Sequence, residues 1–271
     1  MPEKAIITKI TKETKDTFTF RVKYKCNHMP GQFVNVSVLG IGECPISFAS
    51  YSNDYIDLTI RNVGNVTKAI HEKKVGDYLW IRGPYGHGYP METFHGKDIV
   101  LIGGGTGVAP LIGAVDYIEK NISKFKSVTL LFGFRNDESI LFRTNYKRWV
   151  KLFNFDITLD CKTKIEKAIK SNKFTKSSDK VIYKSGLITN LIVEHDLKKD
   201  SIAIVCGPPI MIKFVVQSLL EKGFSEDNIY ISFERLMSCG LGKCGHCEVG
   251  GKYICKHGPV FTYKDSKDRL D

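Results

Sequence analysis

Four cysteines near the C-terminal end of the chain have the spacing of a ligand set for a metal cluster. The C-x4-C-x2-C-x7-C arrangement consists of Cys239, Cys244, Cys247 and Cys255. Gaps of four and then two residues match the ligand spacing of plant-type 2Fe-2S proteins. Glycines between the cysteines let the backbone pass close to a cluster, so that amide N–H groups can point at its sulfur atoms. The spacing therefore predicts a 2Fe-2S cluster with these four cysteines as its metal ligands.

Two alternatives exist for the same cysteines. A zinc site is one, although paired CxxC units are more usual there, and a pair of disulfides is the other. The remaining cysteines are solitary, at Cys26, Cys44, Cys161 and Cys206, which argues against a distributed disulfide framework.

The first residues, MPEKAIITKITKETKD, contain no apolar signal region, and no apolar run approaches the roughly 20 residues needed to span a bilayer. We expect a cytoplasmic protein.

A second candidate site is the glycine-rich segment IVLIGGGTGVAP. Its loop residues are Gly103, Gly104, Gly105, Thr106 and Gly107, between an apolar strand and a helix expected to begin near Pro110. Glycines let a pyrophosphate approach the backbone, and a helix N-terminus supplies N–H groups and a positive dipole. The pattern is GxGxxP rather than GxGxxG, and a tight turn would explain it equally well if it stood alone. Its position after the first strand of an alternating region favours nucleotide binding.

A third candidate is the segment Cys206-Gly207-Pro208, which follows the apolar run SIAIV. Open α/β sheets bind ligands at the carboxyl ends of their parallel strands. A thiol at this place could therefore face a bound ring. Taken alone, a cysteine here is more often a small buried apolar residue.

Two segments of the N-terminal half place hydroxyl groups and backbone amides near strand ends. They are Cys44-Pro45-Ile46-Ser47 and the run from Arg61 to Thr67, which includes Gly64 and Val66. Ordinary turn chemistry accounts for both. Their spacing alone does not indicate a flavin.

The order of strands and helices divides the chain into two types of fold. From Ile6 to about Arg82, short segments rich in β-branched and aromatic residues alternate with Gly, Asn, Asp and Pro, which predicts an antiparallel barrel or sandwich. After Lys97, apolar strands alternate with amphipathic helices, which predicts a doubly wound parallel sheet. We therefore expect a β-barrel domain at 1–95, an α/β domain at 96–233 and a small cysteine-rich module at 234–271.

The composition is that of a globular protein of 271 residues, with 42% hydrophobic and 25% charged residues. Lys and Arg exceed Asp and Glu by 40 to 29, a net charge of +11. This balance is compatible with an anionic cofactor, an acidic partner or nucleic acid. The chain contains no helix-turn-helix pattern, RNA-binding aromatic signature or Lys/Arg-dense recognition helix, so the sequence disfavours a redox- or metal-sensing nucleic-acid binder.

Taken in this order, the motifs resemble the ferredoxin-NADP reductase superfamily. The segments GGGTGVAP and CGPPIM, the cysteine tail and the preceding barrel together cover essentially the whole chain. A 2Fe-2S tail after the nicotinamide domain is similar to the electron-transfer subunit of dihydroorotate dehydrogenase. The segments PISFAS and ERLMSCGLGKCGHCEVGGKYICKHGPVFTY most resemble the B-type subunits of anaerobic sulfite reductases and the related gamma subunits of sulfhydrogenases.

The resemblance assigns roles in the barrel and around the nicotinamide. It implies that Pro45, Ile46 and Ser47 line the isoalloxazine, with the Ser47 hydroxyl near flavin N5, and that FAD's ribityl and pyrophosphate portions are held by Arg61, Gly64, Val66 and Thr67. The family often has Arg where this chain has Cys44, which removes one expected phosphate contact. Cys206 and Glu234 would flank the nicotinamide and the flavin, and Ser47, Cys206 and Glu234 would be the catalytic residues.

The same resemblance implies an NADH-oxidising electron-transfer subunit that contains FAD and a 2Fe-2S cluster. Its partners would be a ferredoxin-like iron–sulfur subunit and a sirohaem-containing catalytic subunit of a sulfite reductase; a dihydroorotate dehydrogenase or hydrogenase complex is the alternative.

Asp160 ends the run FDITLD, near the expected 2′ position of the nucleotide, and its carboxylate favours NADH over NADPH. Lys162, two residues on, could instead swing towards a 2′-phosphate. Lys243, Lys252 and Lys256 surround the cluster loop and could steer an acidic carrier.

Overall fold

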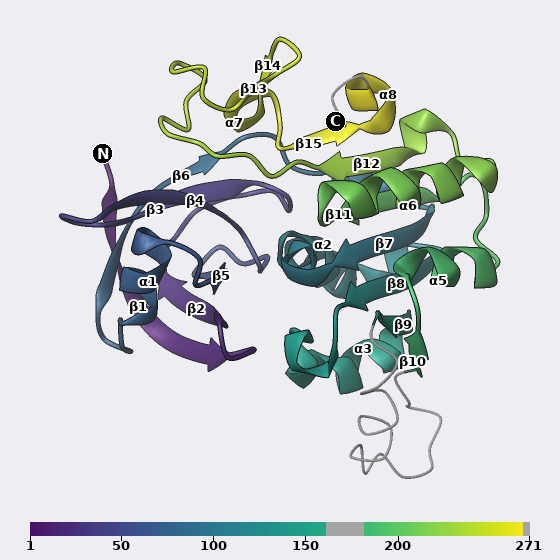
Figure 1. The fold of residues 1–271 in the computed structure, drawn as a ribbon, viewed down its shortest axis with the longest axis horizontal. Coiled ribbons are helices and arrows are strands. Elements are labelled where there is room, and N and C mark those ends of the chain that lie inside the picture. Colours follow the sequence, from purple (N-terminus) through teal and green to yellow (C-terminus); the bar gives the residue numbers. More distant parts are fainter. Residues whose placement is uncertain (161–181, 268–271) are drawn as a thin grey trace. The chain divides into compact units, whose positions relative to one another are not determined.

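The computed structural model describes residues 1–160 and 182–267. The chain forms two compact units, each assembled from separate stretches of sequence. The first unit comprises Met1–Met91, Ala109–Lys120 and Ser232–Phe261, and the second comprises Glu92–Val108, Asn121–Ile231 and Thr262–Asp271. Figure 1 shows their strands and helices. Cys161 and Lys162 lie outside the described residues.

An antiparallel sheet of six strands, in the order β4-β3-β6-β1-β2-β5, forms the body of the first unit. The strands are β1 Glu3–Lys12, β2 Thr17–Lys23, β3 Phe33–Val38, β4 Gly42–Ser47, β5 Ile56–Arg61 and β6 Tyr78–Tyr85. A β-bridge between Phe48, just after β4, and Leu58 of β5 joins the two ends of this order, so the sheet closes on itself. Helix α1, Asn65–His71, follows β5.

Alternation of side chains along the strands builds the core of this sheet. In β5, Ile56, Leu58 and Ile60 are buried, and the residues between them are more exposed. Val34 and Val36 of β3 join the same core. The other face of β3 carries Phe33, Asn35 and Ser37, because successive side chains of a strand point to opposite sides of a sheet.

The second unit contains a sheet in the order β10-β9-β8-β7-β11-β12-β15. Its strands are β7 Asp98–Gly104, β8 Ser127–Phe134, β9 Asn154–Leu159, β10 Ile182–Ser185, β11 Ile202–Cys206 and β12 Ile229–Ser232, with β15 Val260–Thr262 at the edge. The pairs from β10 to β12 are parallel. Every residue of β7 and β11 is buried, as expected for central strands that are covered on both faces.

Helices connect the strands of this sheet. They are α2 Ala109–Lys120, α3 Tyr146–Leu152, α5 Ile188–Glu194 and α6 Pro209–Glu221. Short 3-10 helices occur at Met91–Phe94, Gly105–Val108, Ile122–Lys124, Asp137–Ser139, Arg143–Asn145 and Glu226–Asn228. The C-terminal helix α8 spans Tyr263–Ser266. Within the described residues, no helix is both long and apolar enough to cross a membrane.

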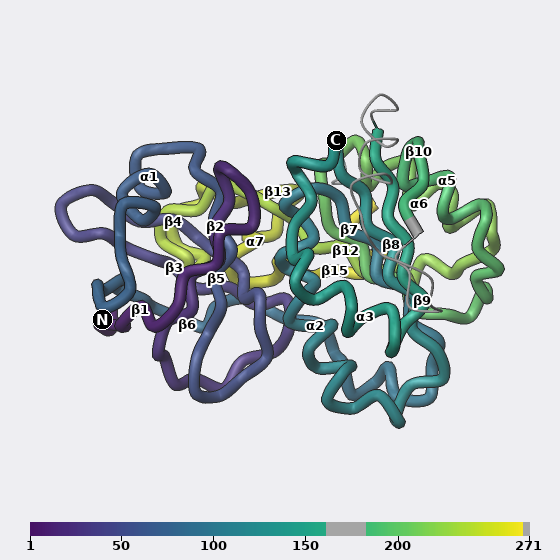
Figure 2. Tube along the Cα trace, turned by 90° about the horizontal axis from the view of Figure 1, so that it is seen from below, coloured from purple at the N-terminus to yellow at the C-terminus, as the bar shows by residue number. Residues whose placement is uncertain are grey.

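The C-terminal cysteine-rich segment packs on the barrel within the first unit. It contains β13 Glu248–Val249, β14 Lys252–Tyr253 and α7 Ile254–His257. Cys247, Ile254, Cys255 and Phe261 form a buried apolar cluster with Phe33 of β3. Figure 2 shows β13 and α7 beside β3 and β4, as Figure 1 does from another side.

The predicted fold class is confirmed: an antiparallel flavin-type barrel, a parallel α/β sheet and a small C-terminal module. The boundaries 1–95, 96–233 and 234–271 stay a prediction.

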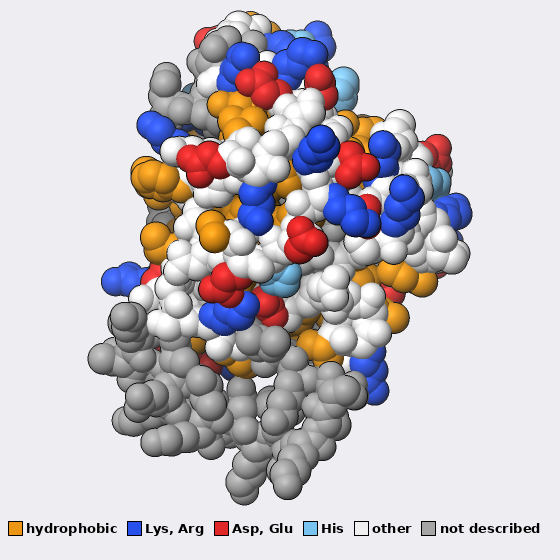
Figure 3. Space-filling model, turned by 90° about the vertical axis from the view of Figure 1, so that its right-hand side faces the viewer, with side chains coloured by type: hydrophobic (Ala, Val, Ile, Leu, Met, Phe, Trp, Pro, Cys, Tyr) orange, Lys and Arg blue, Asp and Glu red, His pale blue; other side chains and the backbone are white. Residues whose placement is uncertain are grey.

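Lys and Arg side chains lie among Asp and Glu side chains on the face shown in Figure 3. On that face the excess of positive charge is therefore not gathered into one continuous basic patch.

Candidate cofactor-binding sites

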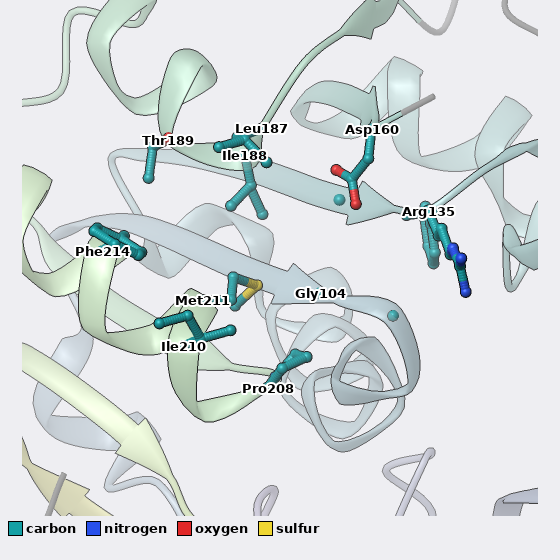
Figure 4. A pocket seen from close by; sticks show the side chains of 13 residues that line it. Gly104, Arg135, Asp160, Leu187, Ile188, Thr189, Pro208, Ile210, Met211 and Phe214 are labelled. Carbon is teal, nitrogen blue, oxygen red and sulfur yellow. The ribbon is translucent and has the colours of Figure 1, made fainter. Parts of the chain in front are cut away.

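A cavity of about 420 Å³ opens at the carboxyl ends of the parallel strands in the second unit. It is lined by Gly104, Gly105, Gly133, Phe134, Arg135, Asp160, Leu187, Ile188, Thr189, Pro208, Ile210, Met211 and Phe214. In Figure 4, Asp160 and Arg135 lie at one end, and the α6 side chains Ile210, Met211 and Phe214 lie opposite Leu187 and Ile188. The cavity therefore combines a polar end with apolar walls, as dinucleotide sites do.

The glycine-rich loop and the segment after β11 meet beside this cavity. Strand pairing sets Cys206 opposite Gly103, and Cys206 is fully buried. A Cβ atom on Gly107 would lie 2.5 Å from the Cα atom of Gly207, so the two loops approach as closely as backbones allow. Gly105 has φ of +54°, a left-handed conformation that glycine adopts without strain.

Of the residues predicted to bind the nucleotide, Gly104, Gly105, Asp160 and Pro208 line the cavity. Gly103 and Thr106 are not part of its lining, and Gly107, Cys206 and Gly207 form the loop contact beside it. The roles of these residues in binding remain predictions.

Asp160 is held at the end of β9 by its backbone. Its amide donates a hydrogen bond to the carbonyl of Phe134 at the end of β8, with an N–O distance of 3.1 Å. Partial burial raises the pKa of the Asp160 carboxyl, and the positive charge of Arg135 opposes that shift. The two side chains present opposite charges to one end of the cavity.

Sequence reasoning missed Arg135. It is exposed and follows β8 directly, and a single arginine after an apolar strand has no distinctive spacing. Its position after Phe134, at the carboxyl end of a predicted parallel strand, is the signal that could have found it.

Backbone amides surround the sulfur atoms of the cysteine loop. Sγ of Cys239 accepts hydrogen bonds from the amides of Leu241 and Lys243, at 3.3 and 3.4 Å. Sγ of Cys255 accepts one from the amide of Gly242 at 3.1 Å, and its own amide donates to Sγ of Cys247 at 3.5 Å. Donors aimed at sulfur stabilise thiolates and iron–sulfur clusters, so the loop fits such a cluster.

The ionisation of the cysteines follows these contacts. Hydrogen bonds from the amides of Leu241 and Lys243 lower the pKa of Cys239 to about 6. Burial, followed by a hydrogen bond with Cys247, raises the pKa of Cys255 to about 11. Cys244 is exposed, whereas Cys247 and Cys255 are buried. In residues 1–160 and 182–267, no three His, Cys, Asp or Glu side chains are already gathered around one point as metal ligands.

The barrel residues predicted to line the isoalloxazine are on β4. Pro45 and Ser47 lie on one face of this strand, and Ile46 packs against the barrel core on the other. Cys44 also faces the core, and burial raises the pKa of its thiol to about 11. The residue that replaces the family's usual arginine is therefore a packed, protonated thiol.

The predicted pyrophosphate segment is a tightly bonded turn at the start of α1. Thr67 Oγ1 accepts hydrogen bonds from the amides of Val63 and Gly64 and donates to the carbonyl of Gly64. Val66 packs on the barrel core, and Arg61 forms an ion pair with Asp16 at 3.0 Å. No described atom lies within 4 Å of a Cβ built on Gly64, so the turn has open space beside its backbone.

Glu234 follows β12 by two residues and belongs to the first unit. Its side chain is exposed, yet the surrounding protein desolvates the carboxyl and raises its pKa. The predicted roles of Glu234, Ser47 and Cys206 at a flavin–nicotinamide contact stay predictions.

Three family models match successive parts of the chain. The oxidoreductase FAD-binding domain matches residues 4–89, and the oxidoreductase NAD-binding domain matches residues 101–217. The iron–sulfur cluster binding domain of dihydroorotate dehydrogenase B matches residues 234–266. The fold and these sites define an oxidoreductase with FAD-, NAD- and iron–sulfur-binding parts.

Relatives extend this match over nearly the whole chain. Sulfhydrogenase 2 subunit gamma of Pyrococcus furiosus is 41% identical over 265 residues, covering 94% of this chain and 87% of that protein. A probable dihydroorotate dehydrogenase B (NAD(+)) electron transfer subunit of Thermococcus kodakarensis is 33% identical, with coverage of 91% and 90%. The chain belongs to the ferredoxin-NADP reductase superfamily and is an NAD(H)-dependent FAD and iron–sulfur electron-transfer subunit.

A solved structure shows the same fold. A chain of an NADH-dependent reduced ferredoxin-NADP oxidoreductase superimposes with a TM-score of 0.76 at 24% identity, covering 98% of this chain and 92% of that chain. The succession of barrel, parallel sheet and C-terminal module therefore occurs in an experimentally determined protein.

Proposed function

We propose that this chain is the NADH-oxidising input subunit of a multi-subunit complex and passes electrons through FAD and a 2Fe-2S cluster to partner subunits. The observation that carries the proposal is the cysteine loop, because its amides are aimed at the sulfur atoms of Cys239, Cys247 and Cys255. The same chain carries a nucleotide-sized cavity in a matched NAD-binding domain. Input and output sites on one chain are what an electron-transfer subunit requires.

In this proposal, different residues bind the nucleotide and the flavin. The loop around Gly105 and Gly107 receives the pyrophosphate of the nucleotide, and Asp160 accepts hydrogen bonds from its ribose hydroxyls. Pro45 and Ser47 face the isoalloxazine, while Cys206 and Glu234 flank the reacting rings. When bound, FAD accepts a hydride from NADH and supplies electrons singly to a one-electron centre.

The nucleotide is NADH rather than NADPH in this proposal. Asp160 supports the choice, since a carboxylate accepts hydrogen bonds from a 2′-hydroxyl and repels a 2′-phosphate. Arg135 shares the same end of the cavity and opposes that discrimination. Flavin reduction by both nucleotides tests the balance.

The first candidate for the partner complex is an anaerobic sulfite reductase. The long C-terminal segment from Glu234 to Tyr263 supports it through its resemblance to the B-type subunits of those enzymes. The chain would depend on partners, because sulfite reductases use a sirohaem coupled to a 4Fe-4S cluster. Once the four tail cysteines hold one cluster, only Cys26, Cys44, Cys161 and Cys206 remain, and none lies in a CxxC-type unit.

A second partner is favoured by a specific observation. The relative at 41% identity is named as the gamma subunit of a sulfhydrogenase, so a hydrogenase complex is the second candidate. Dihydroorotate dehydrogenase B is a third possibility, from the relative at 33% identity.

Reconstitution distinguishes these complexes. We expect the pure chain to oxidise NADH with artificial acceptors and to give no sulfide from sulfite until ferredoxin-like and sirohaem subunits are added. Sulfide formation by the pure chain would contradict the proposal. If sulfite reductase partners give no NADH-dependent sulfide and hydrogenase subunits give NADH-dependent hydrogen turnover, the hydrogenase assignment replaces it.

A further inference from the structure

A charged side chain of the barrel reaches the backbone of the cysteine loop. Arg82 lies on β6, and its Nη1 atom donates a hydrogen bond of 2.8 Å to the carbonyl oxygen of Cys239. Its Nη2 atom lies 3.4 Å from the carbonyl of Ser238. One guanidinium thus holds two successive carbonyls at the start of the loop.

The same guanidinium is anchored by a carboxylate on β4. Nε of Arg82 donates to Oε2 of Glu43 at 2.8 Å, and Nη2 donates to Oε1 of the same residue. The two side chains are only 19% and 24% exposed, so solvent screens the pair weakly. Hydrogen bonding to Arg82 holds the pKa of Glu43 below its usual value. Both groups are charged at neutral pH.

Glu43 is in turn oriented by two side chains of β3. Asn35 donates through Nδ2, and Ser37 through Oγ, each at 2.8 Å. Asn35 is 1% exposed, and its Oδ1 atom has no hydrogen-bond partner among the described residues. An apolar residue would avoid that cost, so the contribution of Asn35 here is the hydrogen bond that it donates to the Glu43 carboxylate.

Strand register connects this network with the strand predicted to line the flavin. Asn35 is paired with Pro45 on one side and with Arg82 on the other. The network therefore occupies the same face of β4 as Pro45 and Ser47, because alternate residues share a face.

The cysteine loop lies directly on this face. A Cβ atom on Gly240 would be 3.0 Å from Nδ2 of Asn35 and 3.5 Å from the ring of Tyr85. Gly240 has φ of +69°, so both its backbone conformation and its space call for glycine. The peptide that follows Cys239 is therefore pressed against the barrel at the place where Arg82 holds it.

We propose that Arg82 and Glu43 form a charge-compensated clamp that positions the iron–sulfur loop on the flavin-binding barrel. Arg82 fixes the Cys239 peptide through its carbonyl, and Glu43 fixes the guanidinium while cancelling its charge near the cluster. Both are positioning residues, since neither is a predicted ligand. The inference rests on the proposed iron–sulfur role of the four cysteines.

The two halves of the clamp act on the cluster with opposite electrostatic sign. Without Glu43, an uncompensated cation lies beside the Cys239 carbonyl and favours the reduced, more negative cluster. Without Arg82, an uncompensated anion lies nearby and disfavours it. Cluster potential responds to net local charge, so removal of Glu43 raises the midpoint potential and removal of Arg82 lowers it.

The first measurement is cluster retention in the purified full chain. The variants are Arg82→Met, Arg82→Lys and Glu43→Gln, and release is followed as loss of visible iron–sulfur absorbance in the presence of a chelator. We expect Arg82→Met and Arg82→Lys to lose the cluster at least about tenfold faster than wild type, because neither retains the planar fork. Flavin content reports separately that the barrel has folded.

The matched control is the ion pair between Arg21 and Asp57. It has the same two-point geometry on the same barrel, with distances of 2.8 and 2.7 Å. Arg21→Met should retain the cluster within about twofold of wild type. If Arg82→Met releases the cluster no faster than Arg21→Met, the clamp is refuted.

The second measurement is the cluster midpoint potential, from a redox titration followed by electron paramagnetic resonance. We expect Glu43→Gln to shift it upward and Arg82→Met downward, each by up to about 59 mV, which is tenfold in a one-electron equilibrium. Arg82→Lys retains the charge and should stay near wild type. Shifts of the same sign in Glu43→Gln and Arg82→Met would indicate simple loosening and overturn the proposal. A wild-type chain without iron or sulfide would instead overturn the proposed function.

Discussion

Asp160 provides the sharpest test of how this chain selects its nucleotide. It occupies one end of the cavity together with Arg135, and Asp160→Asn removes the negative charge with little change of shape. Two unit negative charges, on Asp160 and on a 2′-phosphate, taken as about 6 Å apart, repel each other by about 3 kcal/mol at an effective dielectric constant of about 20. Asp160 is partly solvated and Arg135 opposes it, so we expect about 1–2 kcal/mol of the discrimination to depend on Asp160.

That free energy corresponds to roughly a 5- to 30-fold change in relative rate. The assay is anaerobic stopped-flow reduction of the bound flavin, with NADH and NADPH compared at concentrations below saturation. Wild type should prefer NADH, and Asp160→Asn should lose most of that preference. In the Asp160→Asn background, Arg135→Met should lower the rate with NADPH, since it removes the cation that would bind the 2′-phosphate.

The pH dependence has a defined sign. Burial raises the pKa of the Asp160 carboxyl above its ordinary value of 3.8. Discrimination is therefore complete well above that raised pKa and weakens as the pH falls through it, earlier than for an ordinary aspartate. Faster reduction of wild type by NADPH, or an unchanged nucleotide ratio in Asp160→Asn, would refute the reasoning.

Three further predictions concern the cluster, the loop contact and acid stability. Cys244→Ser should remove most of the iron–sulfur absorbance and leave flavin bound, because thiolates hold iron. Cys26→Ser, at a partly buried thiol with a pKa of about 11, should keep the iron–sulfur absorbance. Full iron content in Cys244→Ser would contradict the cluster assignment. Gly107→Ala places a Cβ atom 2.5 Å from the backbone of Gly207, so nucleotide affinity measured by calorimetry should fall at least about tenfold, and wild-type affinity would disprove the close contact. Burial acts to raise the pKa of Asp98, but hydrogen bonds from a serine and a lysine lower it below 3.8 overall; its stabilisation is complete above that value and lost as the pH falls through the folded pKa. Denaturant unfolding of Asp98→Asn should show a loss of about 1–2 kcal/mol at pH 7 that shrinks towards pH 3, and a constant loss across this range would exclude the linkage.

Local patterns carry most of what could be predicted from this sequence. Strand alternation, the change to alternating strands and helices after residue 97, and the cysteine spacing are all properties of neighbouring residues. Together they indicated the fold class, a nucleotide-binding loop and a cysteine-bound cluster, whereas the flavin was implied only by the resemblance to a known family. The structure and the family matches confirm the fold class and the FAD-, NAD- and iron–sulfur-binding parts. Asp160 lines the cavity at the end of β9, a position set by the local strand pattern, and its role at the 2′ position of a nucleotide stays a prediction.

Contacts between distant residues were not accessible in the same way. Arg82 and Glu43 are 39 residues apart, and Arg82 and Cys239 are 157 apart. No periodicity connects such positions. Cys44 shows the same limit: the family resemblance implied that a phosphate contact is missing there, and only strand pairing opposite Val36 shows that the side chain turns into the barrel core. Nor does chain order reveal that residues 232–261 pack with the barrel.

The basic residues around the cysteine loop fall into two groups: Arg82, which positions the loop, and the lysines predicted to steer an acidic carrier. Arg82 is largely buried and compensated by Glu43, so its charge contributes little to the field outside the protein. Lys252 is half-buried, with its ammonium 5.7 Å from the ring centre of Phe261. Lys243 and Lys256 are exposed, and the stem of Lys256 packs over the backbone of Gly242. Lys243 is exposed and stands next to Cys244, the exposed predicted ligand, so of these three lysines we predict that Lys243 contributes most to steering an acidic carrier.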